Sequence, residues 1–195
     1  MKGDRIYHAG ETFKALYMIR VGSCKTVLLS TCGNSQIAGY YLAGEIVGAD
    51  GIGTGIHKCE AIAVEATEAT ALPFDQIEAL AQFSRPFQRD VHKMLSDECG
   101  RAQDLLILLG SMHADQRIAV FLLDLSRRYQ ARGFSSSEYV LRMTREEIGS
   151  YLGLKLETVS RIFSRLHHEG LIQVQGRTVK LLDRIGLSRI VDGTG

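Results

Sequence analysis

The stretch LETVSRIFSRLHHEG, residues 156–170, decides the fold of the C-terminal part of this 195-residue chain. Apolar side chains recur in it at helical spacing and predict one buried helix face, made of Val159, Ile162, Phe163 and Leu166. Gly170 predicts the end of the helix, because glycine adopts the left-handed conformation of a C-terminal cap at little cost. The opposite face offers a carboxylate, a hydroxyl and a guanidinium, which are the groups that read DNA bases.

The segments around this helix predict a winged helix-turn-helix. Upstream, TREEIGSYLG begins with a capping box of Thr144 and Glu147, and Gly153 separates that helix from the next. Downstream, LIQVQGRTVKLLD predicts two strands joined at Gln175–Gly176. A short strand, EYVLRM, and a helix from about His113 to Arg132 precede the motif. In this arrangement the second helix enters the major groove of DNA.

The residues on the exposed face are predicted to have two different roles in DNA binding. Arg161 can donate a bidentate pair to guanine, Glu157 can accept from cytosine N4, and Ser160 can reach a base edge or a thymine methyl group. A second set is better placed for phosphates: Lys155, Thr158, Arg165, Arg177 and Lys180. The alternative is a charged face that serves solubility only, but residues 140–195 carry nine basic and six acidic side chains, which favours DNA.

The first 75 residues predict an antiparallel β-roll or barrel. They are rich in glycine and contain short β-type runs separated by turn-like breaks: LYMIRVG, CKTVLLS, SQIAGYYL, EAIAVEA and EATALPF. No helix of normal length fits before residue 75. The glycine-rich GADGIGTG lacks the lysine and the following helix of a phosphate-binding loop, so we expect a plain turn there.

A long helix is predicted from Pro86 to about Leu109, spanning about 36 Å. Positions spaced alternately four and three apart form a heptad seam that is polar at its start and apolar at its end, which favours a dimer contact over a helix buried within one subunit. The seam contains His92, Leu95, Cys99, Ala102, Leu106 and Leu109. Across a two-fold axis Cys99 would face its own copy, either as a disulfide or, in the interpretation we adopt, as a reduced thiol that fills space. No charge at the seam centre separates the subunits, so we expect a homodimer without any cofactor.

The predicted fold class is therefore α+β in three segments. Residues 1–80 form the β-roll, residues 84–110 the dimerisation helix, and residues 111–195 the winged helix-turn-helix.

The sequence resembles the CRP/FNR transcription regulators over nearly its whole length. The similar segments are LYMIRVGSCK, YYLAGEIVGADGIGTG, LSRRYQARGFS and GSYLGLKLETVSRIFSRLHHEGLIQVQGRTVKL, in which E-T-V-S-R matches the FNR branch. The resemblance implies a jelly-roll-like sensor of the cyclic-nucleotide-binding type and a homodimeric activator that responds to oxygen or redox state. It also implies a TTGAT-N4-ATCAA palindrome and a contact of the Gly48–Gly55 loop with RNA polymerase. Lys155 departs from the family, which usually has Ser or Thr at this N-cap.

No cofactor can be identified from the sequence. The FNR branch typically holds an oxygen-labile [4Fe-4S] cluster, but Thr70 stands at the matching roll position. The four cysteines, Cys24, Cys32, Cys59 and Cys99, are scattered. We expect no cluster unless a longer N-terminal segment supplies ligands. The GTGIHKCEAIAVEA segment lacks the arginine that grips a cyclic nucleotide, and we expect its His57 and Lys58 to be solvated. The H-x-C spacing of His57 and Cys59 is a weak hint of haem.

Composition and motifs exclude several other classes of protein. No apolar run is long enough to span a membrane and no secretory signal is visible, so a cytoplasmic location is expected. No catalytic triad, phosphate loop or H-E-x-x-H motif supports an enzyme. The remaining alternative is a roll that binds a small ligand or redox signal, with a C-terminal domain that is not a specific DNA reader.

Overall fold

The computed structural model describes residues 1–29, 33 and 35–193, so the predicted turn position of Cys32 lies outside the described residues. The chain forms two compact units, residues 1–104 and residues 105–195, which divide within one long helix. Each unit has its own core and is described by itself.

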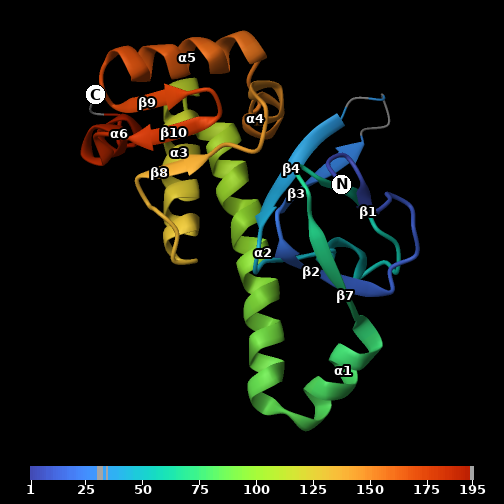
Figure 1. Ribbon diagram of the computed structural model, residues 1–195. Helices are drawn as coiled ribbons and strands as arrows, with labels where there is room; N and C mark the ends of the chain where they lie inside the picture. Colours follow the sequence, from blue (N-terminus) through green and yellow to red (C-terminus); the bar gives the residue numbers. More distant parts are fainter. Residues whose placement is uncertain (30–32, 34, 194–195) are drawn as a thin grey trace. The chain divides into compact units, whose positions relative to one another are not determined.

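The first unit contains the predicted β-roll, which is built from two antiparallel sheets (Figure 1). The four-stranded sheet has the order β1-β6-β3-β4 and the three-stranded sheet the order β5-β2-β7. The strands are β1 (Arg5–Tyr7), β2 (Ala15–Val21), β3 (Ser23–Leu29), β4 (Ser35–Leu42), β5 (Ile46–Val47), β6 (Cys59–Ala63) and β7 (Glu68–Pro73). The five predicted strands are confirmed. The strands β1 and β5 were not predicted, because two or three residues show no alternation.

The core of the roll consists of side chains from the strands of both sheets. Its buried cluster contains Tyr7, Ile19, Cys24, Tyr41, Val47, Cys59 and Ala61. Cys24 is 0% exposed, as its predicted alternation into the strand core requires. The short 3-10 helix η1 (Ala49–Gly51) confirms that the glycine-rich segment is a turn.

Two helices follow the roll. Helix α1 (Phe74–Phe83), which was not predicted as a separate element, leads through Ser84 into α2 (Arg85–Ser111). Pro86 lies in the opening turn of α2, as predicted, where its missing N–H costs no intrahelical hydrogen bond. In the described structure Leu108 is the only buried residue of this 27-residue helix.

The second unit contains the predicted winged helix-turn-helix (Figure 1). Its elements are α3 (Ala114–Gln130), β8 (Glu138–Val140), α4 (Arg145–Leu152), α5 (Leu156–His168), β9 (Ile172–Gln175), β10 (Thr178–Leu181) and α6 (Arg184–Val191). The last three strands form an antiparallel sheet of order β8-β10-β9. Helix α6 packs against α3 and was not predicted, although Asp183 caps its N-terminus by accepting from the Gly186 amide at 2.8 Å.

The turn between α4 and α5 is unusually close. The predicted capping box starts α4, because the Thr144 hydroxyl accepts from the Glu147 amide at 3.1 Å and the Glu147 carboxylate accepts from the Thr144 amide at 2.7 Å. Gly153 ends α4 in the left-handed region with φ 64°. Within α4, a Cβ on Gly149 would lie 2.5 Å from the Leu154 carbonyl oxygen. Only glycine lets the helix backbone approach the turn this closely.

We therefore expect Gly149→Ala to destabilise the second unit by about 1–3 kcal/mol, because the added methyl group forces backbone apart. Urea unfolding followed by circular dichroism measures this. The matched control is Gly110→Ala in α2, where a Cβ meets nothing within 4 Å. In that control the free energy of unfolding should be unchanged or higher by up to about 1 kcal/mol, because alanine has the greater helix propensity. Equal stability of the two variants would contradict the close contact.

Candidate DNA-binding site

The helix α5 is fixed by its apolar face. Val159, Ile162, Phe163 and Leu166 are all buried, as predicted, and α5 packs against α4, whose Ile148 and Leu152 are buried as well. This packing leaves the other side of the helix outward. In Figure 1, α5 lies along one edge of the second unit with the β9–β10 hairpin beside it.

Arg145, the first residue of α4, adds a contact that the sequence reasoning missed. Its guanidinium carbon lies 3.4 Å from the centroid of the Phe163 ring, so a cation covers the face of an aromatic side chain from α5. Burial lowers the pKa of Arg145 to about 10, which leaves the side chain charged at neutral pH. The only sequence signal was a basic residue directly after the Thr144 cap.

The three predicted base-reading residues lie together on the exposed side of α5. Glu157, Ser160 and Arg161 are exposed and belong to its first two turns. Their side chains make no hydrogen bond or ion pair with any other residue that the structure describes. A carboxylate, a hydroxyl and a guanidinium are therefore presented to solvent by a helix whose opposite face is anchored.

The predicted phosphate-contacting residues lie in three places. Lys155 is the exposed N-cap of α5, and Thr158 in the first turn is half-buried. Arg177 and Lys180 are exposed on the β9–β10 wing. Two of these residues lie beside the base-reading residues at the start of α5, and the other two lie on the wing. All four are compatible with contacts to a DNA backbone.

Arg165 differs from the other predicted phosphate contacts, because acidic side chains already hold it. Its guanidinium pairs with Asp115 of α3 and lies 3.5 Å from the carboxylate of Glu169. A phosphate would have to replace or share these partners. Asp115 is a residue that the sequence reasoning missed, since it lies 50 positions upstream.

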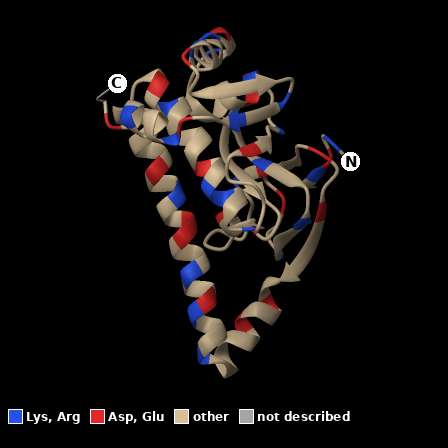
Figure 2. Ribbon diagram, turned by 60° about the vertical axis from the view of Figure 1, so that its left-hand side comes forward, with Lys and Arg blue, Asp and Glu red and all other residues tan. Residues whose placement is uncertain are grey.

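The predicted seam residues of α2 are largely exposed in the single chain. His92, Cys99, Ala102 and Leu106 are exposed, whereas Leu95 and Leu109 are half-buried. Leu106 is 71% exposed. Basic and acidic residues occur together along the helix rather than in one block of a single sign (Figure 2).

A different face of α2 contacts the roll through a polar cluster. The Tyr41 hydroxyl donates to the Glu98 carboxylate at 2.6 Å, and Arg101 pairs with Glu98 while its guanidinium lies 5.7 Å from the Tyr41 ring centroid. Burial, together with the charge of Glu98, raises the pKa of Tyr41 far above its ordinary value. These side chains hold the middle of α2 against the roll.

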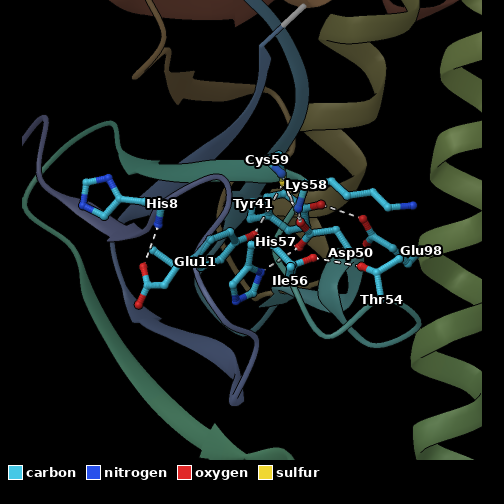
Figure 3. A network of polar contacts seen from close by, with 11 residues as sticks. His8, Glu11, Tyr41, Asp50, Thr54, Ile56, His57, Lys58, Cys59 and Glu98 are labelled. Carbon is cyan, nitrogen blue, oxygen red and sulfur yellow. Dashed lines mark hydrogen bonds and ion pairs between the residues drawn. The ribbon is translucent and has the colours of Figure 1, made fainter.

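A carboxylate organises the glycine-rich turn of the roll (Figure 3). Asp50 accepts from the backbone amides of Lys58 and Cys59 at 2.7 and 3.1 Å and from the Cys59 thiol at 3.3 Å. The Nδ1 of His57 lies 3.2 Å from Asp50, and the Tyr7 hydroxyl donates to the same carboxylate at 3.3 Å. Burial opposes the charge of Asp50, but these hydrogen bonds outweigh it and lower its pKa.

The expectation that His57 is a solvated loop residue is wrong. The residue is 2% exposed, and its ring stacks on Tyr7 with centroids 3.8 Å apart and meets the edge of Phe13 at 5.4 Å. The fold brings residues 7, 13, 50 and 57 together, which no local spacing could reveal. A histidine enclosed by two aromatic rings and a carboxylate is part of the core and is not presented to a haem or an anion.

The described cysteines do not fit a [4Fe-4S] cluster. Cys24 and Cys59 are buried, and burial raises the pKa of each thiol to about 12, so both are protonated at neutral pH. Cys99 is exposed on α2, and Thr70 lies in β7 opposite Met18. Four thiolates are needed, and no group of three or more potential ligands converges among the described residues.

A roll joined by a long helix to a winged helix-turn-helix defines a DNA-binding regulator, and comparison with known proteins gives its family. The protein-family model "Cyclic nucleotide-binding domain" matches residues 1–83, and the protein-family model "Crp-like helix-turn-helix domain" matches residues 116–190. The chain belongs to the CRP/FNR family of transcription regulators, and its matched relatives carry the names of regulators.

Individual relatives match nearly the whole chain. The transcriptional regulatory protein btr of Bordetella pertussis is 43% identical over 97% of this chain and 78% of its own length. The fumarate and nitrate reduction regulatory protein of Escherichia coli is 36% identical over 99% of this chain and 77% of its own. Among solved structures, FixK2 from Bradyrhizobium japonicum is 31% identical with a TM-score of 0.89, covering 97% of this chain and 93% of that one.

Among the described residues, none of the helices combines the length and the apolar character that crossing a bilayer demands.

Lys155 generates a prediction about the N-terminus of α5. It occupies the N-cap without a side-chain hydrogen bond, and a cation there opposes the helix dipole. Lys155→Ser should therefore stabilise the free protein by about 1 kcal/mol. If Lys155 contacts a DNA phosphate, the same change should reduce the slope of log K against log salt by about 0.9 for each bound subunit, or about 1.8 for a dimer. Lys2→Ser, at an exposed site on the roll, is the charge-matched control. An unchanged slope would contradict the phosphate contact.

Asp50 generates a prediction about acid stability. Because its pKa is lowered on folding, its stabilising contribution is complete above the ordinary aspartate pKa of about 3.9 and is lost as the pH falls through the lower folded value. Asp50→Asn should cost about 1–3 kcal/mol at neutral pH, because an amide cannot accept all these hydrogen bonds. It should also flatten the decline of stability below about pH 4. Chemical unfolding over a pH series, with Asp90→Asn on the exposed face of α2 as control, measures both effects.

Proposed function

We propose that this protein is a homodimeric transcription activator that reads a TTGAT-N4-ATCAA palindrome and contacts RNA polymerase. The observation that carries the proposal is the group of Glu157, Ser160 and Arg161, exposed and unpartnered on the second helix of a winged helix-turn-helix. Several relatives support activation by name, among them the transcriptional activator protein Anr of Pseudomonas protegens, which is 40% identical.

The chemistry of the three side chains supports a half-site of this kind. The Arg161 guanidinium matches the O6 and N7 acceptors of the guanine in TTGAT, and Glu157 can accept from the N4 amino group of a cytosine on the opposite strand. Ser160 is small enough to contact a thymine methyl group. Because α5 is anchored by its buried face, the helix backbone that carries these groups is already ordered before it enters the major groove.

The exposure of α2 supports a homodimer. A 27-residue helix with a single buried residue leaves apolar side chains such as Leu106 and Ile107 in solvent, at 71% and 57% exposure. A second copy of the same helix would cover Leu106, which belongs to the predicted seam, through a self-complementary contact, as two-fold symmetry requires. A two-fold dimer then presents two recognition helices to two inverted half-sites, which matches a palindrome.

The proposed polymerase contact uses the Gly48–Gly55 loop. The tip of this loop is exposed at Gly53, Thr54 and Gly55, while Asp50 fastens its start to the beginning of β6. A loop held in this way can offer a preformed surface to another protein, which reduces the ordering cost of binding.

Binding to a labelled TTGAT-N4-ATCAA duplex tests the DNA part of the proposal. Arg161→Ala should weaken this binding by about 1–3 kcal/mol and relax the preference for the guanine. The matched control is Arg127→Ala, an arginine of α3 whose side chain is 78% exposed and pairs with Asp124. If the wild type binds a scrambled duplex equally well, the proposed specificity is wrong.

Sedimentation of the same proteins tests the dimer. The wild type should sediment as a dimer at micromolar concentration without a cofactor, and Leu106→Glu should shift it toward monomer because two carboxylates would meet in the seam. A wild-type monomer under these conditions would contradict the homodimer.

A further inference from the structure

Arg117 links two helix ends that meet at the helix-turn-helix. It lies in the first turns of α3, and its guanidinium donates three hydrogen bonds to backbone carbonyls. Nη2 donates to Leu109 at 2.9 Å, Nε to Met112 at 2.9 Å, and Nη1 to Leu152 at 3.0 Å. Every N atom of this half-buried side chain therefore makes a hydrogen bond to main chain.

The three carbonyls belong to positions where helices normally lack partners. Leu109 lies in the last turn of α2, Met112 follows its end, and Leu152 is the last residue of α4. The last four carbonyls of a helix have no intrahelical donor, and the helix dipole favours a cation beside them. Arg117 satisfies carbonyls from both helix ends at once with N–H groups on three different nitrogen atoms, an arrangement that the single nitrogen of a lysine does not reproduce.

Packing at the same point brings the two helix ends close together. A Cβ on Gly153 would lie 3.0 Å from a methyl group of Leu109 and 3.2 Å from Nη1 of Arg117. Gly153 is the C-cap of α4, and Lys155, only two residues later, is the N-cap of α5. The end of α2 is thus seated directly against the turn that sets the direction of α5.

We propose that Arg117 is a positioning residue for DNA reading, because it fixes the angle of α5 relative to the C-terminal end of α2. The dimer part of this inference rests on the proposed function: if α2 forms the two-fold seam, Arg117 sets the separation of the two recognition helices and so the spacing between half-sites. Its guanidinium acts through the helix ends and makes no base contact of its own.

Hydrogen exchange of the free protein tests the clamp without DNA. In Arg117→Gln, amides in residues 105–113 and residues 149–156 should exchange faster together, by about tenfold, while those of α6 stay unchanged. Arg127→Gln, on the same helix, is the control and should alter neither segment. Unchanged exchange in either segment of Arg117→Gln would overturn the proposal. If Arg117→Gln does not fold, Arg117→Lys, which keeps the charge without the fork, takes its place under the same criteria.

Binding to duplexes with N3, N4 and N5 spacers tests the consequence for DNA. Arg117→Gln should bind the N4 duplex about tenfold or more weakly than the wild type, and its preference for the N4 over the N5 duplex should be smaller. Arg117→Lys should not restore that preference. A role in stability alone would weaken binding to all three duplexes by one factor, and a phosphate contact would change the salt slope. Either result overturns positioning. If the wild type itself shows no spacing preference, the proposed palindrome fails, whereas the exchange experiment still decides whether Arg117 is a clamp.

Discussion

The packing of α5 against α4 is the contact on which the rest of the DNA-binding unit depends. The apolar face of α5 has to be buried, and the close approach at Gly149 determines where α4 receives it. Once that face is fixed, the polar side of the helix can only face outward. The Arg145 guanidinium over Phe163 covers part of the same contact, so a charged side chain contributes to the stability of an otherwise apolar interface.

The roll is organised by a second, polar constraint. The Asp50 carboxylate accepts hydrogen bonds from the residues at the start of β6 and from Tyr7. The His57 ring lies beside this carboxylate and contacts the rings of Tyr7 and Phe13. A carboxylate with this many donors remains charged where burial alone would favour the neutral form. Burial beside this carboxylate raises the pKa of the Cys59 thiol to about 12, so the thiol is protonated at neutral pH.

Helix α2 belongs to both units and has two chemically distinct faces. One face holds the Tyr41–Glu98–Arg101 cluster against the roll, and the exposed apolar stripe around Leu106 is compatible with a second copy. At its end, the carbonyls of Leu109 and Met112 accept from Arg117. One continuous helix in this way links the roll to the winged helix-turn-helix.

Local patterns in the sequence determined most elements of the fold. The 3.6-residue period of 156–170, the capping box at Thr144 and the alternation of the longer strands each report on neighbours a few residues away, and all were confirmed. The exposed positions of Glu157, Ser160 and Arg161 followed from the same helical period.

Tertiary structure alone decided which distant residues meet. The burial of His57, the pairing of Arg165 with Asp115 and the three-carbonyl contact of Arg117 join positions that share no local period. Short elements such as β1, β5 and α6 were equally hidden, because two to eight residues carry little pattern and depend on the surfaces that receive them. The sequence by itself specified the helix that faces outward and what it carries. Only the folded chain specified what holds that helix in place, because hydrogen bonds between distant segments exist only after the backbone has brought them together.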